Sequence, residues 1–178
     1  MNNVFRASSF AFASLAVLAA CAPETAPAAE APAAQAIAAF TAGEDVHAFT
    51  IGAFQAAAVR DGGGAFPNDS NTIAVNVPKA EVDALLTANN LPTDMLSLSI
   101  QPLIVRTADR VLLFDTGAAA TMGDFGGRLP ASLQAAGVDP ADVTDIFISH
   151  EHGDHVGGLV TAEGALAFPN ATVHISAP

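Results

Sequence analysis

From about residue 47 onward the chain alternates short apolar runs with amphipathic stretches, a pattern that predicts a mixed α/β domain. Apolar runs of this length, bounded by Gly, Pro, Asn or Asp, are typical of buried strands. The first run begins at His47 and is expected to end in a Gly-rich turn at residues 61–64. The runs 97–107 and 110–117 are closely spaced, which predicts a hairpin. Three further runs are expected to be strands: 144–149, 165–169 and 171–176.

Two segments have the helical spacing of apolar residues. Residues 78–88 open with a proline, and residues 127–137 end at Gly137, a residue type that is common just after a helix. The alternation of strands and helices indicates a layered α/β fold, in which ligand-binding loops gather at the C-terminal ends of strands. The predicted apolar faces consist of Val82, Leu85 and Leu86 in the first helix and of Leu129, Leu133 and Ala136 in the second.

The first forty residues differ in composition and are expected to lie outside the folded domain. Residues 1–20 place one arginine ahead of an apolar stretch that is too short to span a bilayer, which predicts an export signal. The end of this stretch resembles the bacterial lipoprotein box, so Cys21, the single cysteine, is expected to carry lipid. An ordinary signal peptide cleaved nearby is the alternative. Residues 21–40 then form an Ala/Pro-rich tether, and residues 41–178 form the domain.

The charge of the chain restricts its partners. A formal net charge of -12 with only six Lys and Arg residues argues against nucleic acid, because phosphate backbones are bound by basic side chains. The same sign disfavours adsorption to an anionic membrane surface, so membrane contact is expected only through the lipid on Cys21. These features predict a lipid-anchored protein of the bacterial cell envelope, in the outer membrane or facing the periplasm, that acts on a small molecule. They leave the oligomeric state open.

The heptapeptide SHEHGDH, residues 149–155, holds three of the five histidines of the chain. His150 and His152 are two positions apart, which places both imidazoles on the same side of an extended segment, where they can share one cation. A glycine then permits a sharp turn, so Asp154 and His155 can address a second cation. Two ions roughly 3.5–4 Å apart would activate a hydroxide between them. The cluster contains no cysteine, which argues against a closed structural zinc site, and a surface His-rich loop is the remaining alternative.

The string from His150 to His155 matches the His-x-His-x-Asp-His motif of the metallo-β-lactamase fold superfamily, and residues 148–159 are similar to its wider signature. VLLFDTG, residues 111–117, looks like the family's strand that ends in Asp-Thr-Gly. The chain from about Phe49 onward resembles this superfamily. Its loop TMGDFGGRLP and its run AFPNATV look most like the methyl parathion hydrolase and lactonase branch. The resemblance implies an αββα sandwich, of which this chain holds approximately the first half.

The resemblance also implies roles for individual residues. The cofactors would be two divalent ions, zinc foremost, with iron or manganese as alternatives. Asp115 would accept a hydrogen bond from a ligating imidazole and so orient it. Phe125 lies in a loop that faces the substrate in this branch, although packing is an equal alternative. The implied ligands are His150 and His152 for the first ion and Asp154, also the catalytic residue, with His155 for the second.

The chain departs from the family after the motif. The family uses a third histidine for the first ion, a bridging carboxylate and another histidine for the second ion, all far downstream. Among the few residues after His155, only Glu163 and His174 have suitable side chains, and neither lies at the expected distance. His174 is interpreted as structural, and His47 is given no role. We therefore expect an N-terminal fragment with weak metal affinity, little or no activity of its own, and an exposed sheet face that favours association.

The predicted function is metal-dependent hydrolysis of an ester, lactone, β-lactam or phosphotriester by a metal-bound hydroxide. The motif does not choose among these substrates. The alternative is a non-catalytic envelope lipoprotein that binds metal or a partner. A redox enzyme using iron and a flavin partner is disfavoured, because the export signal and the lipid anchor fit a hydrolase better.

Overall fold

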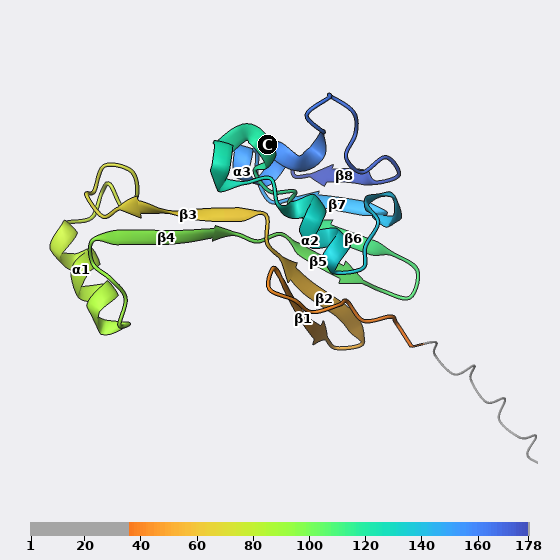
Figure 1. Cartoon of the computed structure of the whole chain (residues 1–178), viewed down its shortest axis with the longest axis horizontal. Helices are drawn as coiled ribbons and strands as arrows, with labels where there is room; N and C mark the ends of the chain where they lie inside the picture. The colour runs from red at the N-terminus through yellow and green to blue at the C-terminus, as the bar shows by residue number, and fades with distance from the viewer. Residues whose placement is uncertain (1–35, 178) are drawn as a thin grey trace, which may run out of the picture. The chain divides into compact units, whose positions relative to one another are not determined.

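The computed structural model describes residues 36–177, and a six-stranded mixed sheet is its largest element (Figure 1). Across this sheet, β1, β2, β5 and β6 are each antiparallel to their neighbour, whereas β6, β7 and β8 run parallel. The C-terminal ends of β6 and β7 therefore lie at the same edge of the sheet. In their order across the sheet the strands are β1 (Val46–Ile51), β2 (Phe54–Val59), β5 (Leu103–Arg106), β6 (Val111–Phe114), β7 (Asp145–Ile148) and β8 (Thr172–Ile175).

A separate two-stranded sheet is formed by β3 (Gly62–Pro67) and β4 (Met95–Ile100), with α1 (Lys79–Ala88) between them in the chain. The prediction of a Gly-rich turn at residues 61–64 is therefore wrong. The glycines permit close packing instead, because a Cβ on Gly64 would overlap the ring of Phe125. The turn lies earlier, at Gly52 between β1 and β2, where φ is +60°.

The predicted hairpin is confirmed for β5 and β6, which pair with Arg106 opposite Val111. The first of the two apolar runs is longer than β5, and its N-terminal part belongs to β4 in the other sheet. The break falls at Gln101 and Pro102. Proline has no N–H for a strand ladder, which accounts for the position of the break.

Both predicted helices are present, as α1 and α2 (Leu129–Ala135), and the chain leaves α2 through Gly137 at φ +79°. No side chain of α1 is buried, and Leu85 is 66% exposed, so the predicted apolar face of this helix does not enter the core. The prediction of a strand at 165–169 is wrong, because Phe168 enters the core from a loop. Four short helical segments complete the described chain: η1 (Ala119–Phe125), η2 (Pro140–Asp142), α3 (Gly153–Val156) and η3 (Gly157–Leu159).

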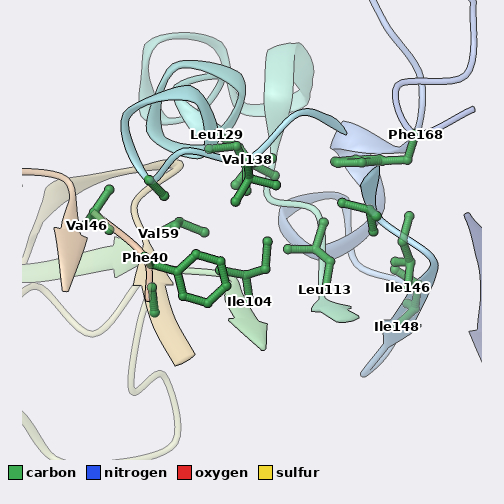
Figure 2. Packing of buried hydrophobic residues seen from close by; sticks show 14 residues of the cluster. Phe40, Val46, Val59, Ile104, Leu113, Leu129, Val138, Ile146, Ile148 and Phe168 are labelled. Atoms are coloured by element: carbon green, nitrogen blue, oxygen red, sulfur yellow. The ribbon is translucent and has the colours of Figure 1, made fainter. Parts of the chain in front are cut away.

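The core lies on one face of the six-stranded sheet. Ile104, Leu113 and Ile146 stand next to one another in register on β5, β6 and β7, and all three are buried (Figure 2). Leu129 and Leu133 of α2 belong to the same cluster. Burial of each such side chain contributes about 1.5–3 kcal/mol. The core therefore fixes β6 and β7, the strands from which the candidate site extends.

The opposite face of the sheet is open within the described residues. Phe114, Phe147 and His174 occupy register positions of β6, β7 and β8 that point away from the core. Their rings stack with centroids 5.2 and 4.6 Å apart, and the two phenylalanines are 36% and 37% exposed. We call these three residues the aromatic row. The sheet thus has the exposed apolar face expected from the sequence.

The predicted mixed α/β fold class is confirmed. The predicted signal peptide and the lipid-bearing Cys21 lie outside the described residues. Within residues 36–177, no helix is both long enough and apolar enough to cross a membrane.

Candidate metal centre

The four predicted ligands follow directly on β7, in a short loop and the first turn of α3. The ring centroid of His150 lies 4.6 Å from that of His152 and 3.9 Å from that of His155. The Nε2 atom of His155 lies 3.4 Å from a carboxylate oxygen of Asp154. The local fold therefore gathers these side chains into one group, which we call the histidine cluster (His150, His152, Asp154 and His155).

The histidine cluster is not a complete ligand set. Across residues 36–177, no group of three or more His, Cys, Asp or Glu side chains is arranged to hold one metal ion. The convergence of all four side chains on a pair of cations stays a prediction. The rings of His150 and His152 meet edge to face, at 69°. The donor types suit zinc, and along the sequence they form two pairs, His150 with His152 and Asp154 with His155.

Two separate recesses border the two pairs. One, of about 280 Å³, is lined by Asp154, His155 and Asp115 together with residues 99–102. The other, of about 370 Å³, is lined by residues 149–152 and by the end of β8. A larger cavity, of about 750 Å³, lies beside η1 and α2 and includes none of the histidine cluster. Asp154 and His155 thus border the smaller of these two recesses, and His150 and His152 border the other.

Asp115 connects the end of β6 to the histidine cluster. One of its oxygens accepts a hydrogen bond from the Nδ1 atom of His155 at 2.8 Å, and the other accepts from the backbone N–H of Ser149 at 2.8 Å. Its backbone is left-handed, with φ of +61°, a conformation that Asp tolerates better than most residues. The orienting contact predicted for Asp115 is thus present in the structure.

Ser149 completes a chain of hydrogen bonds through the site. Its hydroxyl donates to Asp115 at 2.8 Å and lies 3.0 Å from the Nδ1 atom of His150. A serine hydroxyl has one proton, and with that proton on Asp115 the Nδ1 atom of His150 is the donor to the Ser149 oxygen. In both His150 and His155 the Nε2 atom then carries the free lone pair. Ser149 was not singled out from the sequence, although its position directly before His150 is a usable signal.

The surroundings of Asp115 favour its charged form. Partial burial by itself would raise the pKa of Asp115, but hydrogen bonds from the Ser149 backbone, His155 and the Ser149 hydroxyl outweigh burial and hold the pKa below its ordinary value. An ionised carboxylate accepts hydrogen bonds only. The charge state of Asp115 therefore fixes the proton of His155 on Nδ1.

Close backbone packing holds α3 against the end of β6. The carbonyl of His155 accepts from both the N–H and the hydroxyl of Thr116, at 2.8 and 3.0 Å. A Cβ on Gly157 would overlap the carbonyl of Ala118, and a Cβ on Gly158 would overlap the carbonyl of Thr116. The two glycines after the motif are therefore required by this contact, and Thr116 is a second residue that the sequence did not single out.

The remaining candidate residues lie elsewhere. Phe125 stacks on Phe66 of β3 with centroids 5.1 Å apart, so the structure shows it in packing, and a substrate role for it remains a prediction. His174 is bonded to Asp145 of β7 at 2.9 Å, which agrees with its structural interpretation. Neither it nor Glu163 joins the histidine cluster within the described residues.

Comparison with known proteins gives matches over part of the chain. Residues 100–178 match the model of the metallo-beta-lactamase superfamily. A ribonuclease Z from Salinibacter ruber (strain DSM 13855 / M31) is 38% identical over 81 residues, which are 46% of this chain and 22% of that protein.

Two solved structures share the fold over most of the chain. AidC, a dizinc quorum-quenching lactonase in complex with the product N-hexnoyl-L-homoserine, superposes with a TM-score of 0.67 at 32% identity, over 72% of this chain and 43% of that chain. The hydrolase AbOPH of the beta lactamase superfamily gives 0.65 at 27% identity, over 75% of this chain and 45% of that chain. The chain thus spans less than half the length of these two proteins, and its fold corresponds to the part of their fold that it covers.

Proposed function

We propose, from the premise that residues 100–178 belong to the metallo-β-lactamase superfamily, that this chain is part of a metal-dependent hydrolase. The hydrogen-bond chain from Asp115 through Ser149 to His150 and His155 is the observation that supports this most directly. It sets both imidazoles in the tautomer whose Nε2 atom is free to bind a cation. A surface loop rich in histidine has no need of such an arrangement.

In this proposal the two donor pairs belong to two divalent ions, with zinc foremost. His150 and His152 would hold one ion, and Asp154 and His155 would hold the other. When bound, such ions polarise the scissile bond and stabilise the charge that develops on oxygen. The residues of this chain orient the donors: Asp115 keeps the proton of His155 on Nδ1, and Ser149 does the same for His150.

The proposed substrate is a small ester, lactone, β-lactam or phosphotriester. AidC is a lactonase and its structure holds a lactone hydrolysis product, which favours this class. Ribonuclease Z is similar to a shorter stretch of the chain, but a net charge of -12 disfavours an RNA substrate. We further propose that the protein is held at the bacterial cell envelope by lipid on Cys21.

Zinc titration of the 178-residue chain tests the metal site. With two donors in each pair, we expect binding weaker than in a complete three-ligand or four-ligand site and a loss of at least about tenfold in affinity in His150→Ala. His174→Ala is the matched control, because His174 is a histidine of β8 that bonds Asp145 and lies outside the histidine cluster. Equal zinc affinity in the wild type and in both variants would contradict the proposed metal site.

A panel of lactone, ester, β-lactam and phosphotriester substrates tests the hydrolytic part. We expect this chain to bind zinc and to turn over any of these substrates very slowly, because each cation has an incomplete donor set. Zinc binding with no hydrolysis under any condition favours the second candidate, a non-catalytic envelope lipoprotein that binds metal. The absence of a three-donor group within residues 36–177 is the observation that supports this candidate.

A further inference from the structure

Asp61 is a buried carboxylate whose partners all come from one distant loop. Its side chain and backbone are fully buried. One carboxylate oxygen accepts from the N–H of Ala118 at 2.7 Å, and the other accepts from the N–H groups of Gly127 and Leu129 at 3.0 and 2.9 Å. Three backbone donors of this kind satisfy a buried carboxylate directly. Asp61 therefore ties together the two ends of segment 118–129.

The position of Asp61 is itself fixed by its backbone. Its N–H donates to the carbonyl of Ile100 at 2.9 Å, and its carbonyl accepts from the N–H of Arg128 at 2.8 Å. These bonds hold the residue between the end of β4 and the start of α2. The carboxylate is thus a fixed acceptor to which segment 118–129 must conform.

Segment 115–119 is a turn with a left-handed backbone conformation, which is unfavourable unless the surroundings hold it. Asp115, Gly117 and Ala119 have φ values of +61°, +73° and +44°. Left-handed residues other than glycine cost roughly 1–3 kcal/mol and persist only where the surroundings hold them. The N–H that Asp61 binds belongs to Ala118, in the middle of this turn, and a Cβ on Gly117 would overlap the Asp61 carboxylate.

The same turn contacts the histidine cluster from two places. At its start, Asp115 binds the Nδ1 atom of His155 at 2.8 Å. Just beyond its end, the hydroxyl of Thr121 lies 3.1 Å from the carbonyl of Gly153, the first residue of α3. A displacement of the turn would therefore move both the carboxylate that orients His155 and a contact at the start of α3.

We infer that Asp61 is a positioning residue for the histidine cluster. It binds the N–H of Ala118 in the middle of the turn and so keeps Asp115 on His155. The effect on metal affinity rests on the proposed function, whereas the effect on the tautomer of His155 does not depend on a bound cation.

The test compares Asp61→Asn with Ser132→Ala in the 178-residue chain. Asn has the shape of Asp but replaces one acceptor oxygen with an NH₂ group, which would face backbone N–H donors. Ser132→Ala removes the hydrogen bond of a buried hydroxyl to the carbonyl of Arg60, at 2.6 Å, beside the same residue and without touching the turn. Both variants are expected to lower stability, so stability alone does not separate them.

Two other measurements do separate them. Nitrogen NMR reports how much of the neutral His155 ring carries its proton on Nδ1, and calorimetry reports zinc affinity. We expect Asp61→Asn to lose the excess of the Nδ1–H form and to bind zinc about tenfold or more weakly, whereas Ser132→Ala keeps both wild-type values. If Asp61→Asn matches Ser132→Ala in both measurements, Asp61 has only a structural role and the inference is wrong.

The inference and the proposed function can fail separately. A wild-type chain that binds no zinc contradicts the proposed metal site, while the tautomer comparison still decides the role of Asp61. If Asp61→Asn does not fold, amide exchange in the wild type replaces it. Because coupling between two sites is reciprocal, zinc must then slow exchange at Ala118, Gly127 and Leu129. Unchanged exchange at these amides in the zinc-bound chain would overturn the inference.

Discussion

Asp115 combines a left-handed backbone with a carboxylate that three hydrogen bonds hold in place. The two properties depend on each other, because the unusual φ directs the side chain along the sheet edge toward Ser149 and His155. Asn also tolerates this φ, so Asp115→Asn changes the chemistry of the side chain without forcing the backbone to move.

We expect Asp115→Asn to lower zinc affinity by about 10–100-fold and the free energy of unfolding by about 1–3 kcal/mol. The reason is that the Asn side chain supplies one acceptor oxygen where the carboxylate supplied two. Calorimetric zinc titration and urea unfolding measure the two effects. Asp124→Asn on η1 is the control, since it also removes one negative charge but removes no bond to the site. A similar loss of zinc affinity in both variants would show that net charge, rather than orientation, controls binding.

At the scale of elements, one carboxylate links the three parallel strands. Asp145 of β7 binds Arg110, directly before β6, at 2.8 Å and His174 of β8 at 2.9 Å. Hydrogen bonds from His174, Arg110 and Thr144 lower the pKa of Asp145 from 3.8 to about 2. A carboxyl whose pKa is lower in the folded state contributes stability above its ordinary pKa and loses that contribution as the pH falls toward the folded-state value.

Asp145→Asn should therefore change the pH dependence of stability. The difference in unfolding free energy between wild type and variant should be largest above pH 3.8 and should shrink as the pH falls toward about 2. Urea unfolding monitored by circular dichroism over this range measures it. Asp139→Asn is the control outside these strands, because it removes a carboxylate charge but keeps an acceptor oxygen for the N–H of Ala141 at the start of η2. A wild-type minus Asp145→Asn difference that stays constant with pH would contradict the role given to Asp145.

At the scale of the whole described molecule, the open face of the sheet governs behaviour in solution. The aromatic row presents three stacked rings where a solvent-exposed sheet face would present polar groups.

We expect the 178-residue chain to self-associate through this face. Phe147→Ser should weaken the association, at a cost of about 1 kcal/mol in stability from the lost stacking. Sedimentation velocity over a range of concentrations measures it. Leu85→Ser on α1 is the control, and an equal effect of both changes would mean that the association has no preferred face.

The candidate site could be proposed from one short segment of the sequence, whereas the path of the chain around it was predicted less well. The histidine cluster was found because its chemistry lies in one short segment, and helix 127–137 was found because its spacing and its final glycine agree. The segment at 61–64 was predicted wrongly, because its glycines are needed for close packing against Phe125, a residue more than fifty positions away in the chain. Asp61 was missed for the same reason. Its partners are backbone amides, which leave no pattern in side-chain identity.

The parallel pairing of β6 with β7 also determines when the site forms during folding. Asp115 and Ser149 meet only after the intervening crossover through η1 and α2 has closed, since their contact joins residues that are 34 positions apart. A slip of one residue in this pairing would turn Asp115 away from His155. In a refolding experiment, acquisition of zinc should lag behind the appearance of helix and strand signals, and the ion would then report correct strand alignment.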